Sequence, residues 1–293
     1  MSTNKFIPAI WSARILAALE KQLVYTKFFN RDYEGEIRDA GDTVKIGLVG
    51  APTVRKYTRG ADIVAPEDVT ATDTALPIDQ ADYFNIAVDD ADAAQSKINL
   101  LESASSQTGY AFGDVTDKYL AGLLVTGTGG TIGTKDEPKS ITDAKPEDAY
   151  NLLVDLKVAL DRQNCPTMGR ICVVPPEFEG FMLKDSRFVA VATNDSNQRL
   201  TEGTVYKSAG FEIHVSNNAP HNAPHEGVGG SKDGKTVYDV IAGCDQSGTY
   251  AEQILNTEAY RPEKSFKDAV KGLHVYGAKV LRPTCVFNAK VSF

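Results

Sequence analysis

The chain has 293 residues, of which 42% are hydrophobic and 24% are charged, and its 31 Lys and Arg against 39 Asp and Glu give a formal net charge of −8. This composition is that of a globular protein with about two compact units, and it excludes a disordered chain, a collagen and a coiled-coil rod. Charged residues interrupt every apolar run before the ~18 residues of a membrane-spanning helix, and the N-terminus lacks the pattern of a secretory signal. Four cysteines without a Cys-x-x-Cys pair predict buried thiols in a reducing cytoplasm.

Charge is unevenly distributed along the chain. Residues 1–31 carry five basic side chains and one acid, whereas residues 60–96 carry nine acids and no Lys or Arg. Two interpretations stay open: both runs are solvated faces, or a basic arm on one copy meets acidic surface on a neighbouring copy or another partner.

The first third of the chain predicts a helix followed by a long hairpin. Residues 10–29 fit an amphipathic helix, whose apolar stripe must pack on a distant segment or on another subunit. Alternating residues predict a strand over 44–48 and a return strand over 76–88. The polar segment between them, 50–74, is typical of a protruding functional loop.

A long helix is predicted over 98–125. Its apolar stripe consists of Leu100, Leu101, Ala104, Ala111, Val115, Tyr119 and Leu123. The Gly- and Thr-rich run 126–134 is interpreted as a flexible connector at a domain boundary, because its spacing fits neither a dinucleotide fingerprint nor a Walker loop.

The rest of the chain has mixed α/β character. Pro146 opens a helix, and its predicted buried face is Ala149, Leu152, Leu153, Leu156 and Leu160. The further predicted elements are strands over 170–174, 211–215, 237–242, 273–281 and 285–293, short helices over 177–183 and 250–257, and a loop over 216–234.

Residues that could carry chemistry form no consistent pattern. His221 and His225 have a spacing similar to that of zinc ligands, but Pro224 between them opposes a helix that would aim both at one ion. His214 and His274 lie in predicted strands and are interpreted as packed or surface side chains. The sequence therefore predicts no catalytic, cofactor-binding or metal-binding residue, and no enzyme.

Several segments, taken in order, resemble one known family. They are residues 6–14 (FIPAIWSAR), 24–25 (VY), 30–37 (NRDYEGEI), 41–46 (GDTVKI), 78–81 (IDQA), 83–84 (YF), 88–90 (VDD), 259–264 (AYRPEK) and 268–280 (DAVKGLHVYGAKV). Together they resemble the major capsid proteins of tailed bacteriophages, the family with the Hong Kong 97-like shell fold.

The resemblance implies an α+β fold with four parts. An N-terminal arm spans 1–37, and an extended β-hairpin loop spans 38–90. A peripheral domain with a spine helix spans 91–145 with 258–293, and an α/β axial domain spans 146–257. The implied function is self-assembly into an icosahedral shell of hexamers and pentamers that encloses double-stranded DNA. The expected location is the virion, after assembly in the cytoplasm of a host bacterium.

The resemblance also implies partners and contact residues. The expected partners are other copies of the chain, a scaffolding or scaffold-like protein, a portal protein, a decoration protein in some shells, and DNA bound without sequence specificity; no membrane and no cofactor are expected. The candidate contacts between subunits are charged residues of the loop, Arg55, Lys56, Arg59, Glu67 and Asp68. A merely solvated loop stays open as the alternative.

Further alternatives concern cross-linking and function. Some relatives join the loop to a neighbour through a Lys–Asn isopeptide bond, and Lys45, Lys56 and Asn288 are present here without any feature that marks them for it. An encapsulin-type cellular compartment has the same fold and carries enzyme cargo. A soluble hydrolase is the remaining alternative, and a small particle of fixed mass would favour it.

Overall fold

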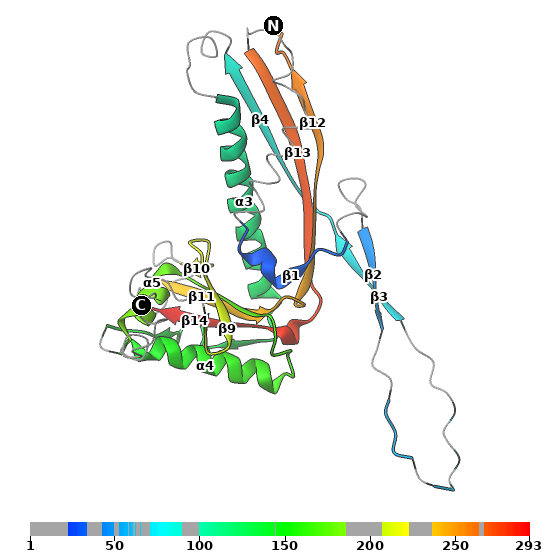
Figure 1. Ribbon diagram of the computed structural model, residues 1–293, viewed down its shortest axis with the longest axis vertical. Helices are drawn as coiled ribbons and strands as arrows, with labels where there is room; N and C mark the ends of the chain where they lie inside the picture. Colours follow the sequence, from blue (N-terminus) through cyan, green and yellow to red (C-terminus); the bar gives the residue numbers. More distant parts are fainter. Residues whose placement is uncertain are drawn as a thin grey trace.

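The computed structural model describes residues 23–33, 43–49, 53–57, 59–60, 62, 65, 71–89, 100–143, 145–185, 207–222, 236–263 and 267–293. These residues form an elongated molecule with three visible parts (Figure 1). A long sheet with a helix beside it rises from a compact α/β unit, and a narrow two-stranded ribbon points the other way.

The long sheet is built mainly from one antiparallel hairpin. Its strand order is β1-β12-β13-β4, with bounds β1 (Phe29–Asn30), β12 (Gly248–Tyr260), β13 (Lys267–Val280) and β4 (Gln80–Asp89). The helix predicted over 250–257 is wrong, because these residues lie in β12 and pair with β13 along its length. Long-range pairing satisfies the backbone there and overrides the local pattern.

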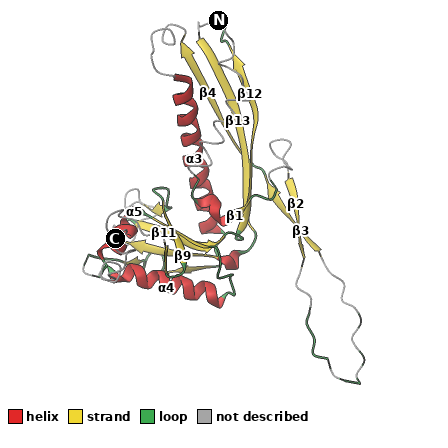
Figure 2. Ribbon diagram, in the orientation of Figure 1, coloured by secondary structure: helices red, strands yellow, loops and turns green. Residues whose placement is uncertain are grey.

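The long helix is confirmed as α3 (Leu100–Thr126), which runs alongside the long sheet (Figure 2). Its predicted buried face is displaced by one position, since Ala111 and Val115 are exposed whereas Phe112 and Leu120 are buried. The aromatic residues of β13 select this face: the ring centroids of Phe112 and His274 lie 5.2 Å apart. Hydrophobicity alone could not choose between two adjacent stripes of similar composition.

The compact unit is a mixed sheet covered by helices. Its main strand order is β5-β14-β11-β7-β9-β8, with bounds β5 (Gly130–Ile132), β14 (Val286–Ser292), β11 (Val237–Cys244), β7 (Arg170–Val174), β9 (Phe211–Val215) and β8 (Lys207–Ser208). Two short strands, β6 (Lys139–Ser140) and β10 (His221–Asn222), pair with β14 and β11. The C-terminal strand therefore lies in this sheet and not beside β13.

Two helices cover this sheet, α4 (Glu147–Arg162) and α5 (Pro176–Lys184). The predicted buried face of α4 is confirmed, because all five of its predicted apolar residues are buried. Glu147 and Asp148 stand in its first turn, where a carboxylate interacts favourably with the helix dipole. Each fully buried leucine contributes about 1.5–3 kcal/mol through the apolar surface it removes from water.

The ribbon consists of β2 (Thr43–Val49) and β3 (Ala71–Pro77), paired antiparallel from Thr43–Pro77 to Val49–Ala71. The single return strand predicted over 76–88 is therefore wrong: the chain changes sheet after Pro77 and continues as β4, which pairs with β13. Proline has no backbone N–H to donate, which makes it a natural end for the ladder.

Two further predictions need correction. The run 126–134 is not a flexible connector, since β5 lies within it and pairs parallel with β14. A Cβ added at Gly129 would lie 2.3 Å from the carbonyl oxygen of Pro283, so the backbone packs too closely here for any side chain. The end of the predicted N-terminal helix is instead a 3-10 turn, η2 (Tyr25–Phe28), followed by β1; residues 1–22 lie outside the described residues.

None of the described helices combines the length and the apolar character that crossing a membrane requires. The four cysteines are free and buried, as the sequence predicts.

Candidate interaction surface on the protruding hairpin

The base of the β2–β3 ribbon is packed into the long sheet. Val44 and Ile46 on β2 and Leu76 on β3 are buried, and they share an apolar core with residues of β12 and β13. This core fixes where the ribbon leaves the molecule.

One glycine makes the junction between ribbon and sheet unusually close. A Cβ added at Gly277 on β13 would lie 2.1 Å from the carbonyl oxygen of Pro77. The Nζ atom of Lys279 also donates a hydrogen bond of 2.8 Å to the carbonyl oxygen of Ala75. The ribbon is therefore held at its base by backbone contact as well as by apolar packing.

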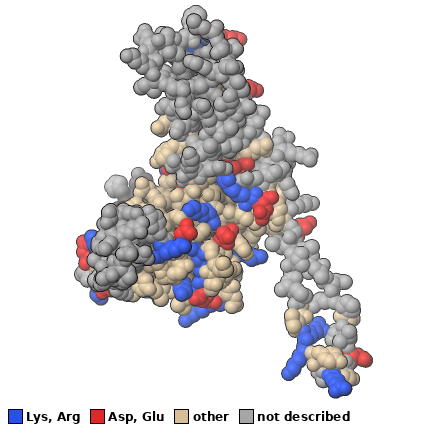
Figure 3. Space-filling view, in the orientation of Figure 1, with Lys and Arg blue, Asp and Glu red and all other residues tan. Residues whose placement is uncertain are grey.

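The described residues of the hairpin tip are exposed, and three of them are basic. Arg55, Lys56 and Arg59 are all exposed, and basic side chains gather at the end of the hairpin far from the body of the molecule (Figure 3). Val54 and Tyr57, beside them, are 94% and 71% exposed. Large apolar side chains interleaved with cations are typical of a surface that docks on another protein.

The remaining candidates are two acids of the loop and Asn288 on β14, a possible cross-linking residue. Glu67 and Asp68 lie outside the described residues, so their contact role stays a prediction. Asn288 is buried at 1% exposure, and its Nδ2 atom donates a 2.9 Å hydrogen bond to Asp239. An isopeptide bond to Asn288 would require this buried contact to open first.

The segment that leads from the N-terminal region is fastened to α3. The Oδ1 atom of Asp117 accepts hydrogen bonds from the backbone N–H groups of Val24, at 2.9 Å, and Tyr25, at 3.0 Å. Asp117 is 1% exposed. Burial raises its pKa to about 6, even though these hydrogen bonds favour the charged form.

A second fastening lies one strand further along the chain. Arg31 follows β1 and forms a 2.6 Å ion pair with Glu252 on β12. Glu252 also accepts a 2.6 Å hydrogen bond from the hydroxyl of Tyr250 and lies 3.1 Å from Nε2 of His274. Burial alone would raise the pKa of Glu252, but hydrogen bonds from His274 and Tyr250, together with the Arg31 charge, hold it below its ordinary value.

The three described histidines have structural neighbours. His274 is fully buried beside Glu252, and His214 lies 2.9 Å from Glu212. His221 is exposed, with its Nδ1 atom 3.1 Å from the carbonyl oxygen of Ala219. These positions agree with the prediction of packed and surface histidines for His214 and His274. His225 lies outside the described residues.

Sequence reasoning missed the two fastening points of the N-terminal segment. The signal available for them was an acid placed in an otherwise apolar pattern: Asp117 lies between apolar positions of α3, and Glu252 follows Tyr250 and Ala251. An acid that is buried needs hydrogen-bond donors. The sequence could not show which distant segment supplies them.

Comparison with known proteins identifies the chain. The sequence profile of the family described as "Phage capsid protein" matches residues 36–289. A chain from Mycobacterium phage Che8 superposes with a TM-score of 0.66 at 28% identity, over 91% of this chain and 90% of that one. A search among curated proteins gives no match.

Two more distant structures share the fold. The capsid structure of the Cyanophage P-SCSP1u superposes with a TM-score of 0.67 at 17% identity, over 87% of this chain and 84% of that one. The mature capsid of bacteriophage PhiM1 gives a TM-score of 0.61 at 18% identity, over 90% and 87%.

The elongated α+β architecture with a long helix and a protruding hairpin is the Hong Kong 97-like fold. The chain belongs to the phage capsid protein family. It is a major capsid protein of a tailed bacteriophage, and the family match favours this function over a cellular compartment. Members of this family are structural proteins of the capsid.

Proposed function

We propose that copies of this chain assemble into an icosahedral shell of hexamers and pentamers that encloses double-stranded DNA. The observation that carries the proposal is the hairpin, whose base is locked into the long sheet while its basic and apolar tip is exposed far from the body. A surface on so long a projection is suited to reach a neighbouring copy. Many such contacts, each weak, give a stable shell when they are repeated around a closed assembly.

The four parts named for this fold divide the chain as follows in our proposal. The N-terminal arm spans 1–37 and the extended loop 38–90. The peripheral domain spans 91–145 with 258–293, and the axial domain spans 146–257. The sheets depart from these bounds, because residues 248–257 of β12 lie in the long sheet, whereas β5, β6 and β14 lie in the sheet of the compact unit. In this division α3 is the spine helix, and β14 carries the C-terminal residues back into the axial sheet, where it pairs with β11.

Arg55, Lys56 and Arg59, with Glu67 and Asp68, are proposed to set the register between neighbouring copies. Opposite charges steer association and penalise wrong alignments, whereas a single solvated ion pair contributes little to stability. The acidic stretch 60–96 and the net charge of −8 also suit a wall that does not hold DNA tightly. The further proposed partners are a scaffolding or scaffold-like protein, a portal protein and a decoration protein; catalysis, a cofactor and a membrane have no part in this function, and assembly takes place in the host cytoplasm.

The test is electron microscopy of full-length protein, produced with and without its neighbouring genes, after sizing chromatography. Wild-type protein is expected to give closed shells, and the triple variant Arg55→Glu, Lys56→Glu, Arg59→Glu is expected to give free capsomers or aberrant particles. The matched control reverses two exposed charges on α4, Lys157→Glu and Arg162→Glu, and should leave shells intact. Normal shells from the triple variant would refute the role of the tip, and a particle of fixed small mass in every preparation would refute assembly.

A further inference from the structure

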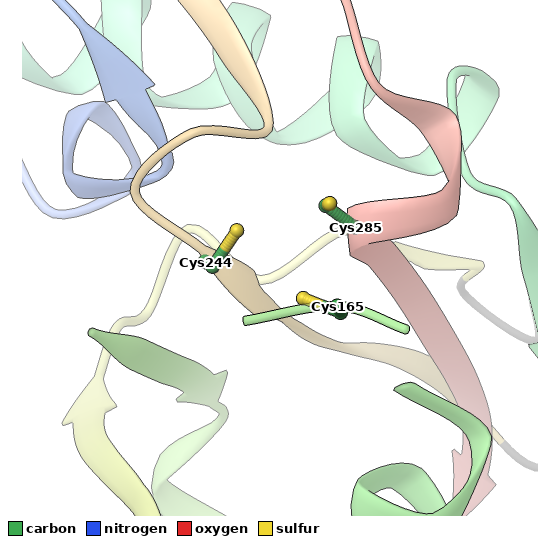
Figure 4. Close-up of side chains that lie close together, drawn as sticks. All are labelled: Cys165, Cys244 and Cys285. Carbon is green, nitrogen blue, oxygen red and sulfur yellow. The ribbon is translucent and has the colours of Figure 1, made fainter. Parts of the chain in front are cut away.

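Three of the four cysteines meet at one point in the compact unit. Cys165 follows α4, Cys244 ends β11, and Cys285 ends the 3-10 turn η4 (Pro283–Cys285). Their sulfur atoms all lie within 4.8 Å of one another, and Figure 4 shows them pointing into the same space from three separate segments. Only the folded topology brings them together, because long stretches of chain separate them.

The spacing of the sulfurs is close to that of a metal site. Zn–S bonds of about 2.3 Å place two sulfurs about 3.8 Å apart in a tetrahedral site and about 4.0 Å apart in a trigonal one. The three thiols therefore need to approach by at most about 1 Å, which small rotations about their Cα–Cβ bonds supply.

The backbone that carries the thiols is already held in place. The guanidinium of Arg170 donates 2.8 Å hydrogen bonds to the carbonyl oxygens of Cys165 and Pro166. The hydroxyl of Ser247 donates to the carbonyl oxygen of Cys244 at 2.6 Å and lies 3.2 Å from that of Cys285. This hydroxyl oxygen is also 4.0 Å from the sulfur of Cys244, at the edge of the cluster.

The alternative is that the thiols only fill space, as buried cysteines commonly do. Burial raises the pKa of Cys165, and the neighbouring thiols raise it further, so this thiol is protonated at neutral pH in the metal-free protein. A metal ion reverses this preference, because it binds the thiolates directly and the displaced protons pass to the solvent. Thiolate sulfur is also the ligand type that selects soft cations.

We propose that Cys165, Cys244 and Cys285 form a buried binding site for one thiophilic metal ion, with Zn²⁺ as the ion available in the cell. The three sulfurs bind it, and the hydroxyl of Ser247 or a water takes the remaining position. The bound ion would join the end of α4, the end of β11 and the start of β14, and would therefore stabilise the compact unit against unfolding.

The test uses full-length protein expressed with added Zn²⁺ or Cd²⁺, so that the ion enters before the core closes. After purification with a phosphine reductant and a chelator wash, we expect one ion per chain, a thiolate-to-Cd²⁺ charge-transfer absorption, and a higher melting temperature than metal-depleted protein. Wild-type protein that retains no stoichiometric metal and shows no such absorption overturns the proposal without recourse to any variant.

The variants locate the site. Cys165→Ser and Cys285→Ser are expected to lower the affinity at least ten-fold, about 1.4 kcal/mol. The matched control is Cys172→Ser, because Cys172 is equally buried on β7 but lies outside the cluster. Equal loss in the control, or full retention in both cluster variants, overturns the assignment.

Discussion

Asp117 on α3 holds the backbone of Tyr25, which lies 92 positions earlier in the chain, through a 3.0 Å hydrogen bond to its amide N–H. The acceptor is a carboxylate that is almost fully removed from water. One buried, titratable group therefore helps to fix the path of the backbone at Val24 and Tyr25.

This contact predicts a pH dependence of stability. Because burial raises the pKa of Asp117 from 3.8 to about 6, the folded state binds its proton more tightly than the unfolded state does. The contribution of this group is thus fully present below the unfolded value and is lost as the pH rises through about 6. The upper limit of the change is about 3 kcal/mol. Asp117→Asn should remove this part of the pH dependence, measured by urea unfolding of unassembled protein across that interval.

The control for Asp117 lies one turn earlier on the same helix. Asp114 forms a surface pair with Lys118 and is 37% exposed, and its charge makes the smallest contribution to the raised pKa of Asp117, so Asp114→Asn should retain most of this pH dependence. If wild type and Asp117→Asn lose stability equally as the pH rises, the buried carboxylate is not the group responsible.

The contacts of Glu252 predict a loss of stability at low pH, the opposite of the pH dependence expected for Asp117. Since hydrogen bonds and the Arg31 charge hold the pKa of Glu252 below its ordinary value, its contribution is present at neutral pH and disappears as the pH falls through the folded-state value. Glu252→Gln should destabilise the protein by about 1–3 kcal/mol at neutral pH, because buried donors lose a charged acceptor. Chemical denaturation measures the loss.

A surface ion pair between β12 and β13 serves as the control for Glu252→Gln. Lys271 and Glu258 are 2.9 Å apart but 52% and 63% exposed, and Glu258→Gln should cost less than about 1 kcal/mol. Equal effects of the two substitutions would contradict a special role for the buried network.

The close junction at Gly277 predicts a defect in stability and in assembly together. Gly277→Ala forces a Cβ against the carbonyl oxygen of Pro77 and should destabilise the fold by about 1–3 kcal/mol. It should also yield fewer closed shells, because the ribbon is displaced at its base. Gly122→Ala on α3 is the control: its Cβ meets open space, and the change should be neutral or stabilising. Thermal denaturation and particle counts by electron microscopy decide the matter, and normal shells from Gly277→Ala would show that the junction tolerates displacement.

The core beneath α4 predicts a conventional packing effect. Leu153 is fully buried, and Leu153→Ala should destabilise the protein by about 2–5 kcal/mol through lost burial and a residual cavity. Val158 lies on the outer side of the same helix at 41% exposure, so Val158→Ala should change the free energy of unfolding by no more than about 0.5 kcal/mol. Similar losses from both would mean that this face of α4 is covered in the protein under test.

Local sequence patterns correctly predicted the elements that need only pack one apolar face against a hydrophobic interior. The face of α4 is right at every position, because five apolar residues at helical spacing leave only one way to bury them. Residues 250–257 were predicted wrongly for the opposite reason: their conformation is decided by pairing with β13, which the sequence of the segment does not contain. The same holds for the change of sheet after Pro77.

The candidate site was predictable in part. Length, polarity and turn residues indicated a protruding hairpin, and its described basic residues are exposed as a contact surface requires. The buried carboxylate at Asp117 and the cluster of Cys165, Cys244 and Cys285 were not predictable, since both depend on which distant segments the topology brings together. Spacing rules detect ligands only when neighbours in space are also neighbours in sequence.

The length of the β2–β3 ribbon amplifies any change of angle at its base. Its seven paired residues on each strand span about 23 Å at about 3.3 Å per residue, so a rotation of about 10° at the base moves the far end by about 4 Å. A shift of that size exceeds the length of a hydrogen bond. The close contact between Gly277 and Pro77 therefore sets where the far end of the ribbon lies, and a small change of angle at this contact would carry that end out of hydrogen-bond reach of a neighbouring copy.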